Sequence, residues 1–345
     1  MENYIDNCKF ISNFQEGDKH LILKEDCNEM LHDRYSKLPL FERIEEMADR
    51  LSSNYYKGSS KKKKTFEKLL YDNANFKKDY KSIMKEFFQS EFCRMKVEEK
   101  EIHKFVDTDR IHYEDALIYA YIKGSLEGFL YEGTIKQVII DEAQDYNRLQ
   151  YIIINNIFRK ADFTVLGDIN QNINPYYHYK SLEDLKDLFR EDTKYIELLK
   201  TYRSSPEIIE YTNKILNLKH VNAIRKDNNK PVIVRKNIEN LKEQLIEDIN
   251  HLTQEYKSFA LITKDRKQAE KLYECIKEDI NISLVDADSK KFKKDCIIVP
   301  AYAAKGLEFD SVIIYNDREN SYRKNERNLL YVACTRCQHE LYIYN

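Results

Sequence analysis

The stretch that decides the fold is VIIDEAQDYNRLQ, residues 138–150. An apolar run passes directly into an acidic loop that contains Asp141, Glu142 and Asp145. In open α/β sheets, ligands bind in the crevice outside the carboxyl ends of the strands. Three carboxylates at one strand end repel one another unless a cation lies among them. This stretch therefore predicts a buried strand followed by a site that binds a cation.

From about residue 130 onward, short β-branched runs alternate with amphipathic segments. The runs are IKQVII, FTVLG, YIELL, PVIVR, FALIT, ISLV, CIIVP, SVIIY and ELYIY. This alternation is typical of a parallel α/β architecture. Before residue 130, apolar residues recur at spacings of three and four in LPLFERIEEMADRL, FEKLLYDNANFKKDYKSIMKEFF and YEDALIYAYIKGSLEGFL. The sequence therefore predicts a helical region followed by α/β structure.

Length and composition bound the remaining classes. The 345 residues, 42% of them hydrophobic, suffice for two ordinary cores. Net charge is −2, which excludes a global positive field for nucleic acid. The run KGSSKKKK, residues 57–64, is interpreted as a flexible basic loop, with phosphate contact as the alternative. No apolar run approaches the ~18 residues of a membrane span, and the first residues lack an apolar signal core, so we expect a cytoplasmic protein.

The seven cysteines are scattered along the chain, which is more typical of reduced thiols than of a disulfide framework. Cys334 and Cys337 form a C-x-x-C pair. A structural zinc site of that kind normally needs a second pair of ligands, and the sequence has none. We therefore expect no zinc or redox role for these thiols.

Polar motifs follow the apolar runs repeatedly. DEAQD follows IKQVII, VLGDINQNI contains Asp168 and Gln171, LLKTYRSSPEI follows YIELL, AYAAKGLEFDSVII follows CIIVP, and LLYVACTRCQHEL contains Arg336. Each alone is an ordinary polar loop or helix end. In this order they resemble motifs II to VI of superfamily 1 UvrD/Rep-like helicases. The short interval between Tyr202 and Lys305 leaves no room for a large inserted domain, and DEAQDY, GDINQ and PAYAAKGLEFD resemble the HelD (helicase IV-like) branch most.

The resemblance implies an α/β fold of two RecA-like lobes with parallel sheets. Residues 1–130 would form a helical region that resembles an insertion in the first lobe. Residues 131–195 would form the remainder of a truncated first lobe, with motifs II and III. Residues 196–345 would form the second lobe, with motifs IV, V and VI.

The resemblance also implies catalytic roles. Asp141 would help to hold Mg²⁺, and Glu142 would orient or deprotonate the attacking water. Gln171 would sense the γ-phosphate of ATP. Arg203 and Arg336 would reach that phosphate from the second lobe and neutralise charge that grows in the transition state.

Further positions would bind the nucleotide and the nucleic acid. Tyr202 would stack on adenine, Glu308 would accept a hydrogen bond from the ribose, and Gly306 belongs to the same nucleotide-binding motif. Tyr176 and Tyr302 would stack on the bases of single-stranded DNA or another nucleic acid. Packing is the alternative for these two tyrosines, because the chain has 26 tyrosines.

One motif of the resemblance is missing. The sequence contains no G-x-x-x-x-G-K-[ST], and none of its seven glycines precedes a lysine. The chain is thus expected to be the carboxyl-terminal portion of a HelD-like motor that cannot hydrolyse ATP alone. It would be a fragment, a split gene product that meets its P-loop on a separate chain, or a non-catalytic remnant that binds nucleic acid or RNA polymerase. RNA polymerase is the partner that the HelD resemblance implies.

Overall fold

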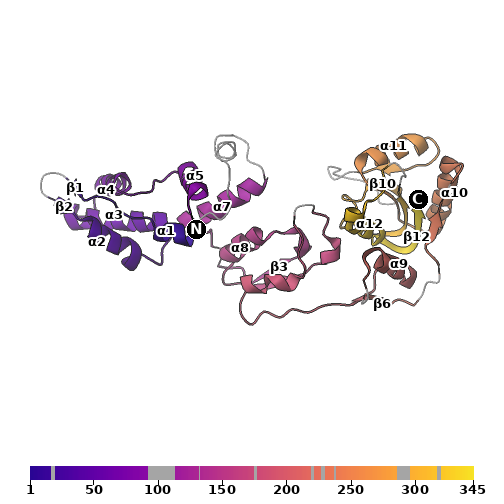
Figure 1. The fold of residues 1–345 in the computed structure, drawn as a ribbon, viewed down its shortest axis with the longest axis horizontal. Helices are drawn as coiled ribbons and strands as arrows, with labels where there is room; N and C mark the ends of the chain where they lie inside the picture. The colour runs from indigo at the N-terminus through magenta and orange to yellow at the C-terminus, as the bar shows by residue number, and fades with distance from the viewer. Residues whose placement is uncertain are drawn as a thin grey trace. The chain divides into compact units, whose positions relative to one another are not determined.

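The computed structural model describes residues 1–16, 20–91, 113–131, 133–174, 177–218, 221–226, 230–236, 238–285, 296–316 and 320–345 (Figure 1). The chain divides into two compact units. Unit 1 contains residues Met1–Ile139 and Asn147–Thr164, and unit 2 contains Ile140–Tyr146 and Val165–Asn345. The acidic loop after residue 140 therefore belongs to the same unit as the carboxyl-terminal sheet.

The amino-terminal region is mainly helical, as predicted. Its elements are α1 (Glu2–Asp6), β1 (Phe14–Glu16), β2 (His20–Ile22), α2 (Lys24–Glu29), a π-helical turn (Met30–Arg34), α3 (Leu40–Tyr56), α4 (Ser60–Asp72), α5 (Tyr80–Gln89) and α7 (Tyr113–Glu127). Ile44, Met47 and Leu51 follow the helical spacing along α3 and are buried. Helix α5 begins where the Asp79 carboxylate accepts hydrogen bonds from the backbone N–H groups of Lys81 and Ser82.

Two features of this region differ from the prediction. The strands β1 and β2 form an antiparallel pair that the sequence patterns did not indicate. Four consecutive lysines, residues 61–64, lie in the first turns of α4, so the interpretation of this run as a flexible loop is wrong. The buried side chains of Phe66 and Leu70, one helical turn apart, anchor α4 to the core and extend the helix back through the lysines.

The first parallel sheet is small. It has two strands, β3 (Gln137–Ile140) and β4 (Asp162–Val165), connected by α8 (Arg148–Ile157). The Asp162 N–H donates to the Lys136 carbonyl and the Leu166 N–H donates to the Ile140 carbonyl, each at 2.8 Å. The pairing advances in the same direction along both segments, so the strands are parallel. Short 3₁₀ turns follow at Ala143–Asp145, Ile169–Gln171 and Leu182–Leu188.

The second sheet has six strands in the order β7-β12-β11-β8-β10-β9, and all of its pairings are parallel. The strands are β7 (Ile233–Arg235), β8 (Phe259–Thr263), β9 (Ser283–Leu284), β10 (Cys296–Pro300), β11 (Phe309–Tyr315) and β12 (Cys337–Tyr344). The helices are α9 (Pro206–Leu216), α10 (Leu241–Glu255), α11 (Arg266–Ile276) and α12 (Arg327–Cys334), with a 3₁₀ turn at Lys324–Glu326. A short parallel pair, β5 (Lys200–Thr201) and β6 (Asn222–Ala223), lies outside this sheet.

Helices cover both faces of the six-stranded sheet (Figure 1). Ala260 and Ile262 of β8 pack in one cluster with residues of α9 and α12. Phe259 and Leu261 of the same strand pack in another cluster with residues of α10 and α11. Successive residues of a strand point to opposite faces, which is why β8 is apolar throughout. This three-layer arrangement confirms the predicted α/β fold with a parallel sheet.

The strand predictions were wrong in part. YIELL, residues 195–199, has no strand assigned to it, and only Ser283–Leu284 of ISLV is a strand. Ile196 and Leu198 are exposed, so the burial that this apolar run predicted does not occur here.

Within the described residues, no helix has the length and apolar character needed to cross a membrane.

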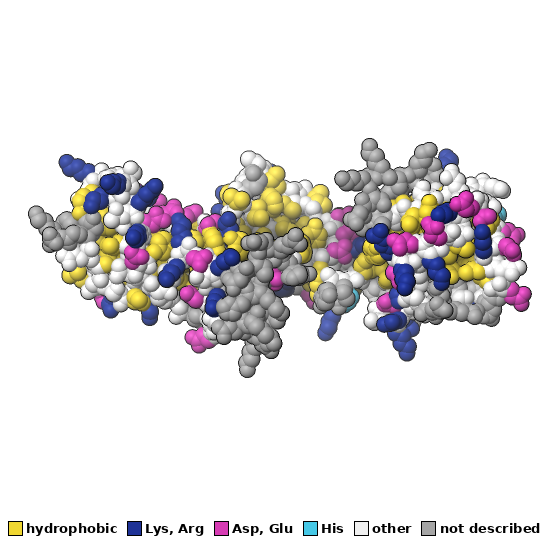
Figure 2. Space-filling model, turned by 90° about the horizontal axis from the view of Figure 1, so that it is seen from above, with side chains coloured by type: hydrophobic (Ala, Val, Ile, Leu, Met, Phe, Trp, Pro, Cys, Tyr) yellow, Lys and Arg dark blue, Asp and Glu magenta, His cyan; other side chains and the backbone are white. Residues whose placement is uncertain are grey.

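Charged side chains are mixed over the surface. On the face drawn in Figure 2, lysine and arginine side chains lie among aspartate and glutamate side chains. This mixture agrees with the net charge of −2. Hydrophobic side chains gather in one area of this face (Figure 2).

Candidate functional site

The acidic loop begins where β3 ends. Glu142 adopts a left-handed backbone conformation, with φ of 50°, and its N–H donates to the Asp141 carboxylate at 2.8 Å. A residue with a side chain rarely adopts this conformation, so the surrounding contacts must hold it. In this loop Asp141 is exposed and Glu142 is partly exposed.

The buried side chain of Gln144 joins this loop to the loop after β4. Its amide nitrogen donates to Glu142 Oε2 at 2.6 Å, and its amide oxygen accepts from the Asp168 N–H at 2.9 Å. Gly167 allows this approach, because a Cβ atom there would lie 2.6 Å from the Gln144 amide oxygen. The DEAQD and GDINQ motifs therefore converge at the edge of the sheet where β3 and β4 end.

Gln171 links this edge to the motif that contains Arg336. The Gln171 amide nitrogen donates to Asp168 Oδ2 at 3.0 Å, and its amide oxygen accepts from Arg336 Nη2 at 2.8 Å. Arg336 is only 1% exposed, and its Nε donates to the Val332 carbonyl at 3.0 Å. Burial, assisted by the charge of Arg203, lowers the pKa of Arg336 to about 10. Arg336 therefore contacts the predicted phosphate sensor but is itself shielded from solvent.

Lys305 is a site residue that the sequence analysis missed. Its ammonium lies 2.7 and 2.6 Å from the two carboxylate oxygens of Asp145, 3.5 Å from Glu142 Oε2 and 3.3 Å from the Gln171 carbonyl oxygen. The side chain is 12% exposed. The available signal was its position directly before Gly306 in AKGLEFD, because the charge of a lysine within a ligand-binding motif needs an oppositely charged partner.

Arg203 and Glu308, two of the residues expected to contact ATP, pair with one another. Arg203 Nε lies 2.8 Å from Glu308 Oε1, and the Gln338 amide donates to Glu308 Oε2 at 2.9 Å. Tyr202, which precedes Arg203, is exposed. Gly306 has φ of 79° and open space around the position of a Cβ atom. Tyr202 and the Arg203–Glu308 pair thus lie at the surface of unit 2.

The predicted nucleic-acid contacts are less well placed. Tyr302 is exposed in the turn before Lys305, as a stacking residue must be. Tyr176 lies outside the described residues. The functional roles of both tyrosines stay predictions.

The side chains of the acidic loop offer donor atoms of the type that a hard divalent cation prefers. Asp141, Glu142 and Asp145 supply carboxylate oxygens, which Mg²⁺ prefers as ligands. One cationic side chain, Lys305, already lies near two of these three acids, Glu142 and Asp145.

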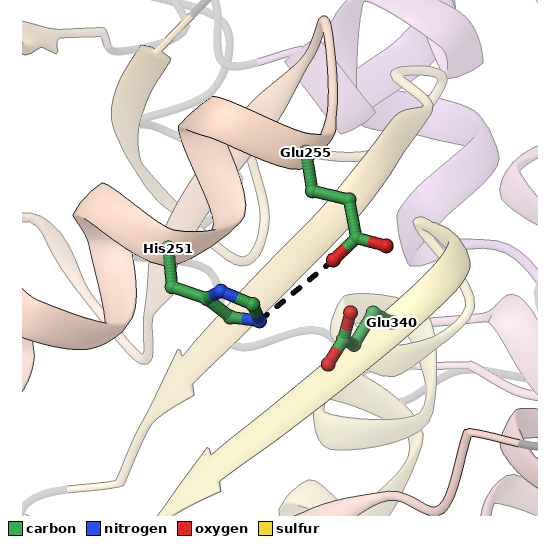
Figure 3. A group of neighbouring side chains, drawn as sticks. All are labelled: His251, Glu255 and Glu340. Carbon is green, nitrogen blue, oxygen red and sulfur yellow. Dashed lines mark ion pairs between the residues drawn. The ribbon is translucent and has the colours of Figure 1, made fainter.

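A second group that could hold a metal lies on α10 and β12 (Figure 3). His251 Nε2 lies 3.7 Å from Glu255 Oε2, and Glu340 is buried beside them. However, the Lys230 ammonium donates to Glu255 and, at 2.8 Å, to Glu340 Oε2. Tyr256 also donates to Glu340. The positive charge of Lys230 balances that of the acids and Tyr256 adds a hydrogen bond, so the cluster forms an ion-pair network that joins α10 to β12.

Two protein-family models match the chain. The UvrD/REP helicase N-terminal domain matches residues 2–181, and the UvrD-like helicase C-terminal domain matches residues 295–344. RecBCD enzyme subunit RecB of Chlamydia pneumoniae is 36% identical over 87 residues, which are 23% of this chain and 8% of that protein. An ATP-dependent helicase/nuclease subunit of Alkaliphilus metalliredigens is 25% identical over 198 residues, which are 53% of this chain and 16% of that protein.

Among solved structures, the C-terminal domain of a possible DNA helicase from Lactobacillus plantarum WCFS1 is 30% identical, with a TM-score of 0.35. The match covers 42% of this chain and 86% of that one. The chain spans only a small part of the curated relatives, at 8% and 16% of their lengths. The N-terminal family match nevertheless covers more than half of the 345 residues. The chain therefore belongs to the UvrD/REP helicase family.

Proposed function

We propose that this chain supplies motifs II to VI of an ATP-dependent DNA helicase or translocase. One observation carries the proposal. Gln144, Gln171, Lys305 and Arg336 connect the loops after β3 and β4 to motifs V and VI within one compact unit. Loops from two sheets that share one polar network have the arrangement needed to respond together to a ligand.

The residues would divide the work as follows. Mg²⁺ held at Asp141 would neutralise phosphate charge. Glu142 would orient the attacking water and accept its proton, and the left-handed backbone would fix the direction of its carboxylate. Arg203 is accessible enough to leave Glu308 for a phosphate oxygen. Gln171 would transmit the presence of the phosphate to the buried Arg336 through their 2.8 Å hydrogen bond.

We further propose that the phosphate cradle comes from a polypeptide outside residues 1–345. Backbone N–H groups and a lysine must surround the triphosphate, and no P-loop motif occurs in this sequence. A strand that carries a P-loop would extend the β3–β4 sheet. Two observations support this role: among the described residues this sheet has two strands, and Ile139 of β3 is 64% exposed. Central strands of parallel sheets are normally buried on both faces.

The test is co-expression of this chain with the P-loop fragment of a HelD-like helicase, followed by an ATPase assay with single-stranded DNA. We expect hydrolysis only in the complex. Glu142→Gln and Arg203→Gln should each lower the rate by about 10³ or more, because both act on the transition state. Turnover by the chain alone that Glu142→Gln abolishes would contradict the requirement for a P-loop.

A second candidate is a binding protein without hydrolysis. It is favoured by the pairing of Arg203 with Glu308 and by the burial of Arg336, because the polar groups already satisfy one another. A folded complex with the P-loop fragment that remains inactive would support this candidate. Its partners would be single-stranded DNA or, from the HelD-like motifs, RNA polymerase. Binding assays with single-stranded DNA and with purified core polymerase would distinguish the two partners.

A further inference from the structure

Lys305 lies where a cation would be expected in the acidic loop. Its ammonium is within 3.3 Å of three oxygen atoms, two from Asp145 and one from the Gln171 carbonyl. Glu142 Oε2 adds a fourth oxygen at 3.5 Å. A lysine that is 12% exposed and surrounded by oxygens resembles a bound cation more than a surface charge.

Glu142 and Asp145 lie in the same loop as Asp141, the residue proposed to hold the divalent ion, and their carboxylates are further oxygens that such an ion would recruit. Mg²⁺ and Mn²⁺ prefer carboxylate and carbonyl oxygens. An oxygen that accepts a hydrogen bond from an ammonium is not free to coordinate a metal. In a partly desolvated site, the ammonium and the divalent ion also repel each other strongly. The two cations therefore compete for the same loop.

We infer that Lys305 is an internal competitor of the divalent cation, so that metal binding at the acidic loop requires the release of Lys305 from Asp145 and Glu142. The inference rests on the proposed metal-binding role of this loop and specifies how the site is regulated. Lysine suits this role, because its flexible four-carbon stem lets the ammonium move while the backbone stays in place. The buried side chains of Ala301 and Ala304 hold the turn that carries Lys305.

The first experiment uses the wild-type chain. Lysine side chains are acylated with a limiting amine reagent, with and without saturating Mn²⁺, and modification is measured by mass spectrometry. We expect Mn²⁺ to raise the modification of Lys305 about fivefold, as typical coupling between two ligands allows. Lys264 is the matched control, since it is buried in the same unit and pairs with Glu326 at 2.7 Å. Its modification should not change.

Sodium chloride at equal ionic strength controls for charge screening. If Mn²⁺ leaves Lys305 modification unchanged, or if sodium chloride raises it equally, the inference is wrong. The measurement needs no nucleotide and no P-loop fragment.

The second experiment measures Mn²⁺ affinity by electron paramagnetic resonance. Lys305→Gln should bind Mn²⁺ about tenfold more tightly than the wild type. Lys214→Gln removes an exposed positive charge elsewhere in the same unit and should leave the affinity within about twofold. Equal affinities for the wild type and Lys305→Gln would overturn the inference, as would an absence of Mn²⁺ binding to both. Failure of the ATPase reconstitution would leave these results unaffected.

Discussion

The β3–β4 sheet and the six-stranded sheet have similar local sequences but different environments. Strands β8, β10 and β11 of the six-stranded sheet are almost wholly buried between two helical layers. Strand β3 is equally apolar, yet Ile139 is 64% exposed, and β4 has no fully buried residue. Both sheets nevertheless end in polar motif loops. An apolar sequence therefore predicts a strand that needs packing partners, but the strand is buried only where other strands and helices pack against it.

The largest expected difference is between Ile313 in β11 and Ile139 in β3. Ile313→Ala should lower the free energy of unfolding of unit 2 by about 3 kcal/mol, because it opens a cavity in a closely packed layer. Ile139→Ala should change stability by less than about 0.5 kcal/mol, because the side chain is already exposed. Urea denaturation of both variants measures this contrast. In the complex with the P-loop fragment, Ile139→Ala should destabilise the protein more than it does in the chain alone. If Ile313→Ala and Ile139→Ala lower the free energy of unfolding of the chain alone equally, the contrast between the two sheets is wrong.

A smaller effect is expected where the β4 loop meets the acidic loop. Gly167→Ala places a Cβ atom 2.6 Å from the Gln144 amide oxygen and 3.0 Å from the Ala143 backbone nitrogen. Because the backbone must shift, we expect a loss of about 2 kcal/mol in the free energy of unfolding. Gly306→Ala is the control with open space, and its positive φ alone should lead to a loss of about 1 kcal/mol. A loss from Gly167→Ala no larger than that of the control would show that the loop is loosely packed.

The helical region offers an independent reference for both sheets. Asp79→Ala removes the N-cap of α5 and should destabilise unit 1 by about 1 kcal/mol at pH 7. The hydrogen bond from Ser82 lowers the pKa of Asp79. A carboxyl with a lowered folded-state pKa stabilises the fold above its unfolded pKa and loses that effect as the pH falls through the folded value. The difference between variant and wild type should thus vanish in acid.

Thermal unfolding monitored at several pH values measures this effect. Asp79→Asn is the matched control, since it retains an acceptor without the charge. A difference that persists undiminished in acid would contradict the assigned role of the carboxylate.

The smallest effect on stability is expected in the 195–199 segment. Ile196→Ser and Leu198→Ser should each change the free energy of unfolding by less than about 0.5 kcal/mol, because both side chains are exposed. The same changes should reduce self-association, since exposed apolar segments promote it. Analytical ultracentrifugation of the double variant compares the two states. Unchanged self-association would show that another surface of the chain mediates it.

Sequence patterns predicted the fold where periodicity and burial agree. FALIT, CIIVP and SVIIY are strands because each has helices on both faces. YIELL is also mainly apolar but has no strand assigned to it, since local propensity does not supply a pairing partner. The interpretation of the lysine run as a loop was wrong because Phe66 and Leu70 determine the helix through tertiary contacts.

The candidate site was predictable in its motifs but not in its pairings. The positions of Asp141, Glu142 and Gln171 followed from strand ends and from the resemblance. The contacts of Lys305 with Asp145 and of Arg203 with Glu308 join residues far apart in sequence. Long flexible side chains choose among several nearby partners, and no local pattern specifies which one they contact.

The sheet order of unit 2 has a consequence for the time course of folding. Among the described residues, strand β7 lies at the edge of the sheet and pairs with β12, the last of these strands in sequence, although β7 is the first. Strand β7 can therefore join the sheet only after every other strand of the sheet has been synthesised. Such non-local pairing slows folding and leaves a partly formed sheet with open edges. During that delay, β11 is a temporary edge where a chaperone or a second unfinished chain would bind first.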